Sequence, residues 1–170
     1  ELTNGDEMSM SGLSYDMSVS IVSGSTVNAC GSPQQVSVGQ RLSGTIGDDA
    51  SSDLAASCAS GTASNAEKIY SLQLDRPQEI IIDATPQVGT EDLTVSLQRR
   101  CLASDSEIAC ANDSGEGKTE TIQEQLSAGT YYIVVQAPGD TSLGDFGMTI
   151  ERNVYTTCGP QDNYCIDSNT

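Results

Sequence analysis

Histidine and tryptophan are both absent from this chain of 170 residues, and phenylalanine occurs once, at Phe146. Without histidine, the chain has neither the Ser-His-Asp nor the Cys-His machinery of nucleophilic catalysis, and no histidine-ligated zinc. We therefore expect a protein that is not an enzyme. Because aromatic residues are so few, its core has to be built from valine, isoleucine, leucine and the six tyrosines.

Basic residues are also scarce, since seven Lys and Arg stand against 24 Asp and Glu, a net charge of −17. Nucleic acids and anionic membranes are bound by clustered Lys and Arg, so we expect neither as a partner. No apolar run is long enough for a transmembrane helix, and we expect no membrane insertion. The chain also starts without an initiator Met or a basic-then-apolar leader. We expect the mature part of an exported precursor, or a fragment of a larger protein.

Six cysteines without a single histidine, and without C-x-x-C pairs, indicate disulfides rather than a zinc site. Disulfides in turn indicate an oxidising compartment, and we expect a secreted protein at or outside the cell surface. Locality in the sequence pairs Cys101 with Cys110 and Cys158 with Cys165. Elimination then leaves Cys30 for Cys58.

Apolar and polar residues alternate with a period of two along much of the chain, whereas helical periodicity is missing. Short strands separated by Gly, Asp, Pro and Ser predict an all-β antiparallel sandwich. The run Ile80-Ile81-Ile82 predicts a strand buried on both faces. Residues 47–64 predict a long loop fixed by Cys58. The expected strands cover residues 15–22, 42–46, 69–74, 79–84, 93–98, 119–126, 130–136 and 146–150.

Six segments form an ordered series of motifs: QRLSGTI at 40–46, EKIYSL at 67–72, EDLTVSL at 91–97, CANDS at 110–114, AGTYYIVV at 128–135 and GDFGMTI at 144–150. In this order they resemble the bacterial pre-peptidase C-terminal (PPC) domain family over about residues 38–152. Two departures are present. Phe146 replaces the usual tyrosine, and the strand after Ile80 lacks the cysteine that many members pair with the one matching Cys58. The partner of Cys58 therefore stays open at this point.

The resemblance implies a disulfide-stapled, jelly-roll-like β-sandwich of roughly 8–10 strands. It also implies a bacterial protein, because the family is bacterial. Members of the family are commonly non-catalytic appendages of secreted proteases and other exoproteins. Some are implicated in binding substrate polymers, and some bind Ca²⁺. We accordingly divide the chain into an N-terminal arm (1–37), a PPC-like sandwich (38–152) and a cysteine-bearing tail (153–170).

Three acidic turns lie at expected strand ends: Asp48-Asp49 with Asp53, Glu91-Asp92, and Asn112-Asp113-Ser114. Calcium takes six to eight oxygen ligands, which converging loops of this kind can supply. The alternative is that Asp and Asn cap these turns by bonding their own backbone. Asp92, Asp113 and Asn112 are the metal ligands we would choose, with calcium as the cofactor. Asn112-Asp113-Ser114 is also an N-glycosylation sequon.

The strand expected in the N-terminal arm presents one apolar face, formed by Tyr15, Met17, Val19 and Ile21. It either pairs with its own sandwich or completes the sheet of a neighbouring copy by strand addition. Repeated head to tail, the second arrangement gives a filament, with copies of the chain as partners.

Two functions follow. The first is a non-catalytic extracellular structural subunit that self-assembles at the cell surface, through donation of its N-terminal strand. The alternative is an accessory module of a secreted hydrolase, which binds extracellular polysaccharide or protein. Tyr131 and Tyr132 are the aromatic candidates for stacking on sugars, although neighbours in a strand point to opposite faces, so we expect one in the core and one at the surface.

Overall fold

The chain folds into β-strands joined by loops, in a computed structural model that describes residues 30–47, 54, 56–59, 66–89, 92–112, 114–137 and 144–153. The assembly strand expected around Val19, the candidate ligand Asp113 and the pair Cys158 and Cys165 lie outside these residues. Across the described ranges, no helix is long and apolar enough to cross a membrane. Within the described residues, one short 3-10 helix, η1 (Ser104–Ser106), accompanies nine strands, listed in chain order: β1 (Gln34–Val36), β2 (Arg41–Ile46), β3 (Glu67–Leu74), β4 (Gln78–Pro86), β5 (Thr94–Gln98), β6 (Glu107–Ala111), β7 (Glu120–Leu126), β8 (Gly129–Gln136) and β9 (Gly144–Arg152).

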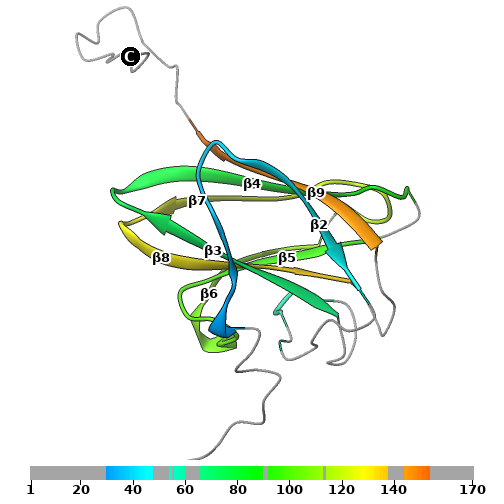
Figure 1. The fold of residues 1–170 in the computed structure, drawn as a ribbon, viewed down its shortest axis with the longest axis horizontal. Helices are drawn as coiled ribbons and strands as arrows, with labels where there is room; N and C mark the ends of the chain where they lie inside the picture. Colours follow the sequence, from blue (N-terminus) through cyan, green and yellow to red (C-terminus); the bar gives the residue numbers. More distant parts are fainter. Residues whose placement is uncertain are drawn as a thin grey trace, which may run out of the picture.

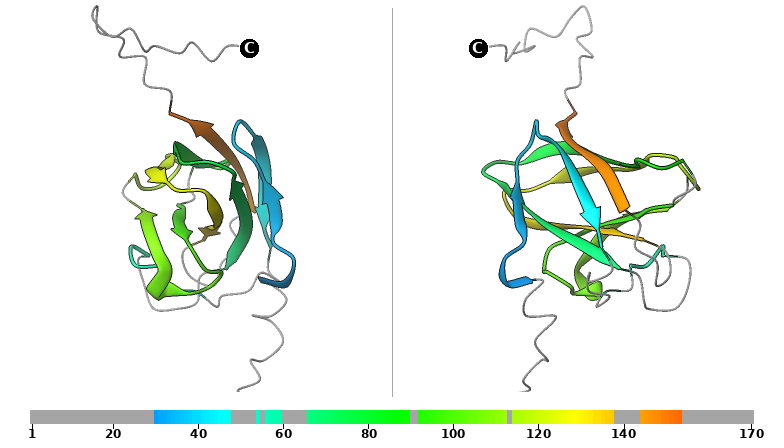
Figure 2. Two further views of the ribbon diagram at one scale, coloured as in Figure 1. Left: turned by 90° about the vertical axis from the view of Figure 1, so that its left-hand side faces the viewer. Right: turned by 45° about the vertical axis from the view of Figure 1, so that its right-hand side comes forward.

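The strands form two sheets that pack face to face, as Figures 1 and 2 show. The five-stranded sheet has the order β1-β3-β8-β5-β6, and the four-stranded sheet has the order β2-β9-β4-β7. Every pairing is antiparallel except that of β1 with β3, where Gln34 lies beside Tyr70 in a parallel register. The sequence-based prediction of a disulfide-stapled all-β sandwich is therefore confirmed.

The core lies between the sheets and is built from the inward-facing residue of each alternating pair. Tyr70, Tyr131 and Phe146 are its largest fully buried side chains, and the rings of Tyr70 and Phe146 meet edge to face at 6.3 Å between centroids. Around them pack aliphatic side chains from both sheets, such as Leu72 and Ile82. Burial of this apolar surface is the main stabilising contribution to the fold. Aliphatic side chains supply most of it, because the chain has few aromatic residues.

The prediction for the isoleucine run was only half right. Ile80 and Ile82 are fully buried in the core, but Ile81 is half-buried on the outer face of β4. The reason is geometric, since β4 keeps strict alternation and the outer face of its sheet is open. β1, by contrast, lies within the segment assigned to the arm and yet joins the five-stranded sheet.

Candidate functional site

The strand ends that flank four connections lie at one end of the sandwich; the connections are residues 47–66, 87–93, 112–119 and 137–143. The strand registers establish this, because Ile46 pairs with Gly144, Ala84 with Glu120, and Glu67 with Gln136. The three acidic turns of the sequence all fall in these connections, so we call this the acidic end. Two of the connections touch, since a Cβ at Gly117 would clash with the backbone of Gly89.

Two of the three candidate metal ligands are described, and both belong to this end. Asp92 accepts a hydrogen bond from the backbone N–H of Leu93 through Oδ1, at 3.0 Å. Asn112 donates its side-chain Nδ2 to the backbone carbonyl of Cys58, also at 3.0 Å. Within the described ranges, no three His, Cys, Asp or Glu side chains come close enough to hold a metal ion. The described residues therefore act as turn-holding groups, and they do not by themselves fit a calcium ion.

The bond from Asn112 also bears on the glycosylation sequon. A glycan would be attached to the same Nδ2 atom that donates to Cys58, within a half-buried contact. Attachment would replace one donor hydrogen and require the bond to re-form around a bulky substituent.

Two buried carboxylates that the sequence analysis missed hold the loops of the acidic end. Glu67 and Glu120 are the first residues of β3 and β7, and both are at most 4% exposed. Glu67 accepts from the backbone N–H of Leu54 at 3.3 Å, and Glu120 accepts from that of Ser114 at 2.9 Å. The sequence could have indicated the burial of Glu120, because it lies an even number of residues from Ile122 and Leu126 and therefore points to the same face of the strand.

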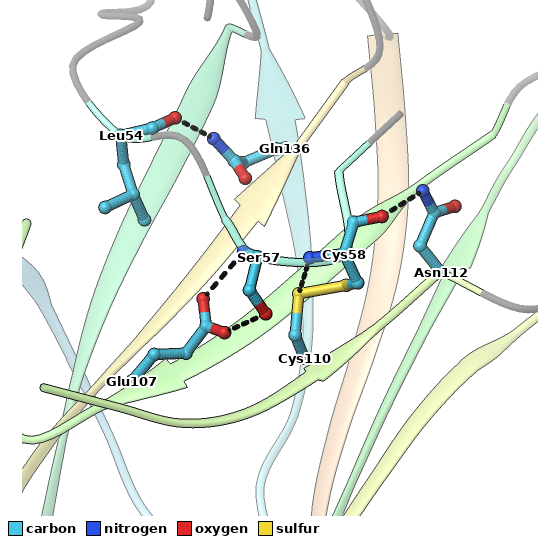
Figure 3. The surroundings of a disulfide bond; sticks show 7 residues. All are labelled: Leu54, Ser57, Cys58, Glu107, Cys110, Asn112 and Gln136. Carbon is cyan, nitrogen blue, oxygen red and sulfur yellow. Dashed lines mark hydrogen bonds between the residues drawn. A yellow bond between two sulfur atoms is a disulfide. The ribbon is translucent and has the colours of Figure 1, made fainter. Parts of the chain in front are cut away.

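Residues 54 and 56–59 are held on the outer face of the five-stranded sheet (Figure 3). Cys58 is bonded to Cys110 of β6, and Ser57 donates from its backbone N–H to Glu107 at 3.1 Å. Gln136 Nε2 donates to the carbonyl of Leu54 at 2.7 Å. The side chain of Leu54 adds an apolar contact with Ile69 and Val134.

The predicted pairs Cys101–Cys110 and Cys30–Cys58 were wrong, whereas Cys158–Cys165 lies outside the described residues and stays a prediction. The structure joins Cys30 to Cys101 and Cys58 to Cys110, with Cα–Cα distances of 5.9 and 5.8 Å. The β5–β6 register places Cys110 opposite Ser96, inside the paired part of the hairpin, whereas Cys101 lies in the loop beyond the end of β5. The two cysteines are therefore too far apart to be bridged. Both bridges thus end on the β5–β6 hairpin, one in its loop and one in β6.

The two sheets differ in what covers their outer faces. On the five-stranded sheet, the polar side chains of Thr94, Ser96, Gln98 and Gln136 point outward but are at most 3% exposed. On the four-stranded sheet, the outward residues of every strand are exposed or half-buried. We call this second surface the open face, and it comprises Arg41, Ser43, Thr45, Glu79, Ile81, Asp83, Thr85, Thr121, Gln123, Gln125, Asp145, Gly147, Thr149 and Glu151.

Polar side chains on the open face are paired across strands. Thr45 donates to Asp145 at 2.6 Å, joining β2 to β9. Thr121 donates to Asp83 at 2.7 Å, and Gln123 donates to Glu79 at 2.6 Å, both joining β7 to β4. These bonds hold carboxylates and amides in fixed positions on a solvent-exposed sheet, an arrangement suited to hydrogen bonding with a ligand.

The tyrosine pair divides between the two faces of β8, as predicted. Tyr131 is fully buried in the core, where its hydroxyl donates to the carbonyl of Ser127 at 2.9 Å. Tyr132 points outward but packs, half-buried, against the cluster formed by Leu54, Ile69 and Val134. Neither tyrosine ring exposes its face to solvent, so these two residues do not support stacking on sugars.

Among the described residues, the tyrosine with a clearly shifted pKa, Tyr70, is part of the core. Burial raises the pKa of Tyr70 to about 12, because the ionised phenolate would lose its hydration. Its hydroxyl is buried and has no hydrogen-bond partner. This tyrosine lies between the sheets, where a substrate has no access, and its raised pKa keeps the hydroxyl neutral.

No family model and no curated protein sequence matches the chain. Among solved structures, it is similar to the pre-peptidase C-terminal domain of a collagenase from Bacillus anthracis, with a TM-score of 0.51 and 12% identity over 71% of this chain and 95% of that one. Weaker similarity extends to CorA, a surface-associated copper-binding protein of Methylomicrobium album BG8, with a TM-score of 0.44 and 8% identity over 70% and 98%. A family 35 carbohydrate-binding module from Cellvibrio japonicus has a TM-score of 0.36 and 14% identity over 64% and 87%. The chain has the fold of a PPC domain, as its motifs predicted.

Proposed function

We propose that this protein is a non-catalytic accessory module of a secreted bacterial protein, and that it binds an extracellular polysaccharide through the open face. The observation that carries the proposal is a difference between the two sheets: the outward polar side chains of β5 and of the end of β8 are buried, whereas those of all four strands of the other sheet are exposed or half-buried. On the exposed one, carboxylate and amide groups are already fixed by cross-strand hydrogen bonds. Such groups accept from and donate to sugar hydroxyls without first losing side-chain freedom.

The binding test uses co-sedimentation of the full chain with insoluble cellulose, chitin and xylan. The double variant Asp83→Ala with Gln123→Ala removes one member of each cross-strand pair between β4 and β7. We expect it to lower the affinity for the bound polymer about tenfold or more, since each lost bond to a charged group is worth roughly 1.5–3 kcal/mol.

The matched control is Gln73→Ala on the other sheet. Gln73 is exposed in β3 and accepts a hydrogen bond from Thr130 at 2.6 Å. The Gln73→Ala variant therefore loses a similar cross-strand hydrogen bond and leaves the open face unchanged. Binding that is retained by the Gln73→Ala variant and lost by the double variant supports the proposal. Equal binding by both variants, or no sedimentation with any of the three polymers, would contradict it.

Self-assembly through the N-terminal strand is a second proposal. What supports it is the position of β2, which has a described partner, β9, on one side and is the edge strand of its sheet on the other. An added strand would extend the sheet at this edge by main-chain hydrogen bonds. Electron microscopy with sedimentation of the full chain tests it. Fibres that disappear on deletion of residues 1–24 are expected, and uniform monomers would overturn it.

Calcium at the acidic end is the remaining proposal, with Asp92, Asp113 and Asn112 as its ligands. It is supported by the strand register, which carries the Asp92 and Asn112 connections to the same end of β5 and β6. Thermal unfolding with calcium and with a chelator is the direct test. A melting temperature that rises with calcium and loses this rise in Asp92→Asn is expected, and identical curves would exclude the site.

A further inference from the structure

The positions of the two bridges and of the last strand carry an inference that does not depend on ligand binding. We propose that the sandwich is also a tension-bearing link between its flanking segments, and that the Cys30–Cys101 bridge carries the load past the first five strands. The flanking segments are residues 1–29 and 154–170.

Tension from the N-terminal side enters the described structure at Cys30. This residue is bonded to Cys101 across a sequence separation of 71. The residues between them contain β1 to β5 in full. Because a covalent bond resists far more force than hydrogen bonds do, the load passes through the two sulfur atoms and continues from Cys101. The backbone from 31 to 100 is not in the load path.

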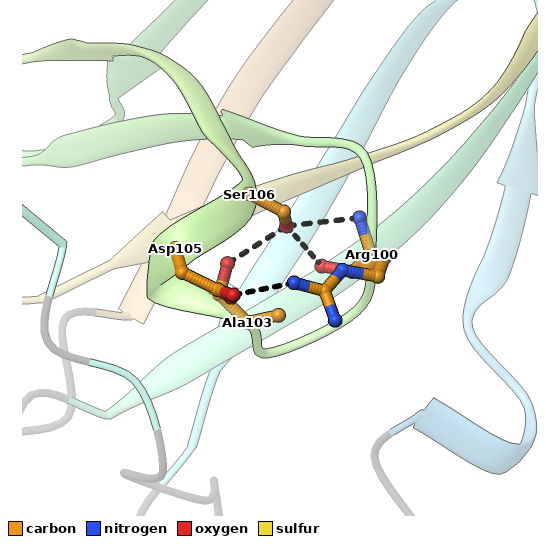
Figure 4. Close-up of polar contacts among 4 residues, drawn as sticks. All are labelled: Arg100, Ala103, Asp105 and Ser106. Atoms are coloured by element: carbon orange, nitrogen blue, oxygen red, sulfur yellow. Dashed lines mark hydrogen bonds and ion pairs between the residues drawn. The ribbon is translucent and has the colours of Figure 1, made fainter.

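The loop that receives the load is internally cross-linked (Figure 4). Ser106 is its hub, since its hydroxyl accepts from the backbone N–H of Arg100 at 3.0 Å and donates to the carbonyl of Ala103 at 2.7 Å. The backbone N–H of Ser106 also donates to Ala103, at 2.8 Å. The side chains of Arg100 and Asp105 close the loop with an ion pair of 2.6 Å. Cys101 is therefore attached to a stiff loop.

Tension leaves the described structure at the end of β9. This strand lies between β2, which pairs with its residues 144–149, and β4, which pairs with its residues 146–152. Its inward side chains Phe146, Met148 and Ile150 are at most 1% exposed. A pull at Asn153 therefore acts on a strand that is held by two neighbours and by its core side chains. Without the bridge, a pull from the other side would instead peel off β1, which pairs over three residues at a sheet edge.

The bridge therefore sets how far the protein can extend. With Cys30–Cys101 intact, complete unfolding releases only the segment 101–153, about 17–19 nm at 3.3–3.6 Å per residue. The backbone between the two cysteines, a sequence separation of 71, would span about 23–26 nm if extended, and the bridge keeps it out of the load path. The second bridge, Cys58–Cys110, ties the shielded segment to the load path without shortening it.

Force spectroscopy of the full chain, held by handles at its two ends, tests the proposal. The variant Cys30→Ser with Cys101→Ser is expected to lengthen the contour released on unfolding by about 6–7 nm, because the load path then runs from residue 30 to Cys58, across the second bridge, and on from Cys110. It is also expected to lower the unfolding force, because the pull then starts at β1.

The control is the variant Cys58→Ser with Cys110→Ser, which removes a bridge that lies outside the shortest covalent path. Its released contour length should equal that of the unaltered protein. Far-ultraviolet circular dichroism of both variants confirms beforehand that each is folded. The proposal is overturned if the Cys30/Cys101 variant unfolds at the same force as the unaltered protein, or if the contour length does not change.

Discussion

The hydroxyl of Tyr70 lies directly over the α-carbon of Gly44, across the space between the two sheets. Tyr70 belongs to β3 and Gly44 to β2, and a Cβ built on Gly44 would clash with this hydroxyl and with the ring of Phe146. The glycine is thus required by close packing, and not by its backbone angle. It lets the aromatic pair of the core approach the edge strand of the facing sheet.

We predict that Gly44→Ala lowers the free energy of unfolding by about 1–3 kcal/mol, the usual cost of overpacking a core. Urea unfolding followed by circular dichroism measures the change. Gly31→Ala serves as the control, because a Cβ at Gly31 meets no atom within 4 Å. Equal stability of the two variants would mean that the core yields at this point.

Tyr70 also makes stability depend on pH in the alkaline range. An unfolded tyrosine ionises near pH 10, whereas burial raises the pKa of Tyr70 to about 12. Between these values the folded protein binds more protons than the unfolded chain, so stability is fully present below pH 10 and falls as pH rises toward 12. The loss amounts to about 2–3 kcal/mol over this interval at 1.36 kcal/mol per pKa unit.

We predict that Tyr70→Phe removes this loss, so that the variant exceeds the unaltered protein in stability at pH 12. At neutral pH the variant should be equally stable or slightly more so, because the hydroxyl it lacks has no partner. Tyr131→Phe should instead cost about 1 kcal/mol at neutral pH, since it removes the bond to Ser127. Parallel pH curves for Tyr70→Phe and the unaltered protein would refute the assignment.

The strands could be predicted because alternation is a local signal. The stretch Tyr131 to Val135 identifies its strand from a few neighbouring residues, and Glu120, Ile122 and Leu126 share one face. The disulfides could not be predicted, because the partner of Cys101 depends on where a segment 71 residues away comes to lie. Locality pointed to Cys110, and only the register of β5 with β6 shows that the two cysteines lie apart.

The open face could not be predicted for a similar reason. Alternation in the sequence predicts that Asp83 and Gln123 point outward. It does not predict that β4 pairs with β7, which is what brings the two residues onto one surface. Alternation likewise cannot tell which sheet face is covered. Gln98 and Thr121 both alternate with apolar residues, but the first is fully buried and the second is exposed.

The pairing of the cysteines leads to a third prediction. Digestion of the unreduced protein should yield peptides that link Cys58 to Cys110 and Cys30 to Cys101, with no peptide closed by Cys101 and Cys110. Replacing Cys58 and Cys110 together by serine should lower the free energy of unfolding by about 4 kcal/mol, on the chain-entropy model for a loop of this length. A peptide containing both Cys101 and Cys110 as one bridge would contradict the pairing.

A fourth prediction compares two glutamines on the covered face of the five-stranded sheet. Gln98 and Gln136 are both fully buried, on the neighbouring strands β5 and β8. Gln98 has no hydrogen-bond partner for either atom of its amide, whereas Gln136 donates to the carbonyl of Leu54 at 2.7 Å. The same substitution should therefore have opposite effects at the two positions.

Gln98→Met replaces an unpartnered amide by an apolar group of similar length, and we predict a gain of about 1–2 kcal/mol in the free energy of unfolding. Gln136→Met should cost about 1–3 kcal/mol, because the buried carbonyl of Leu54 then loses its donor. Urea unfolding of both variants under identical conditions gives the comparison. A loss of stability in Gln98→Met would show that the amide is bonded in solution, and the sign of this one difference therefore decides whether the covered face is dry or hydrated.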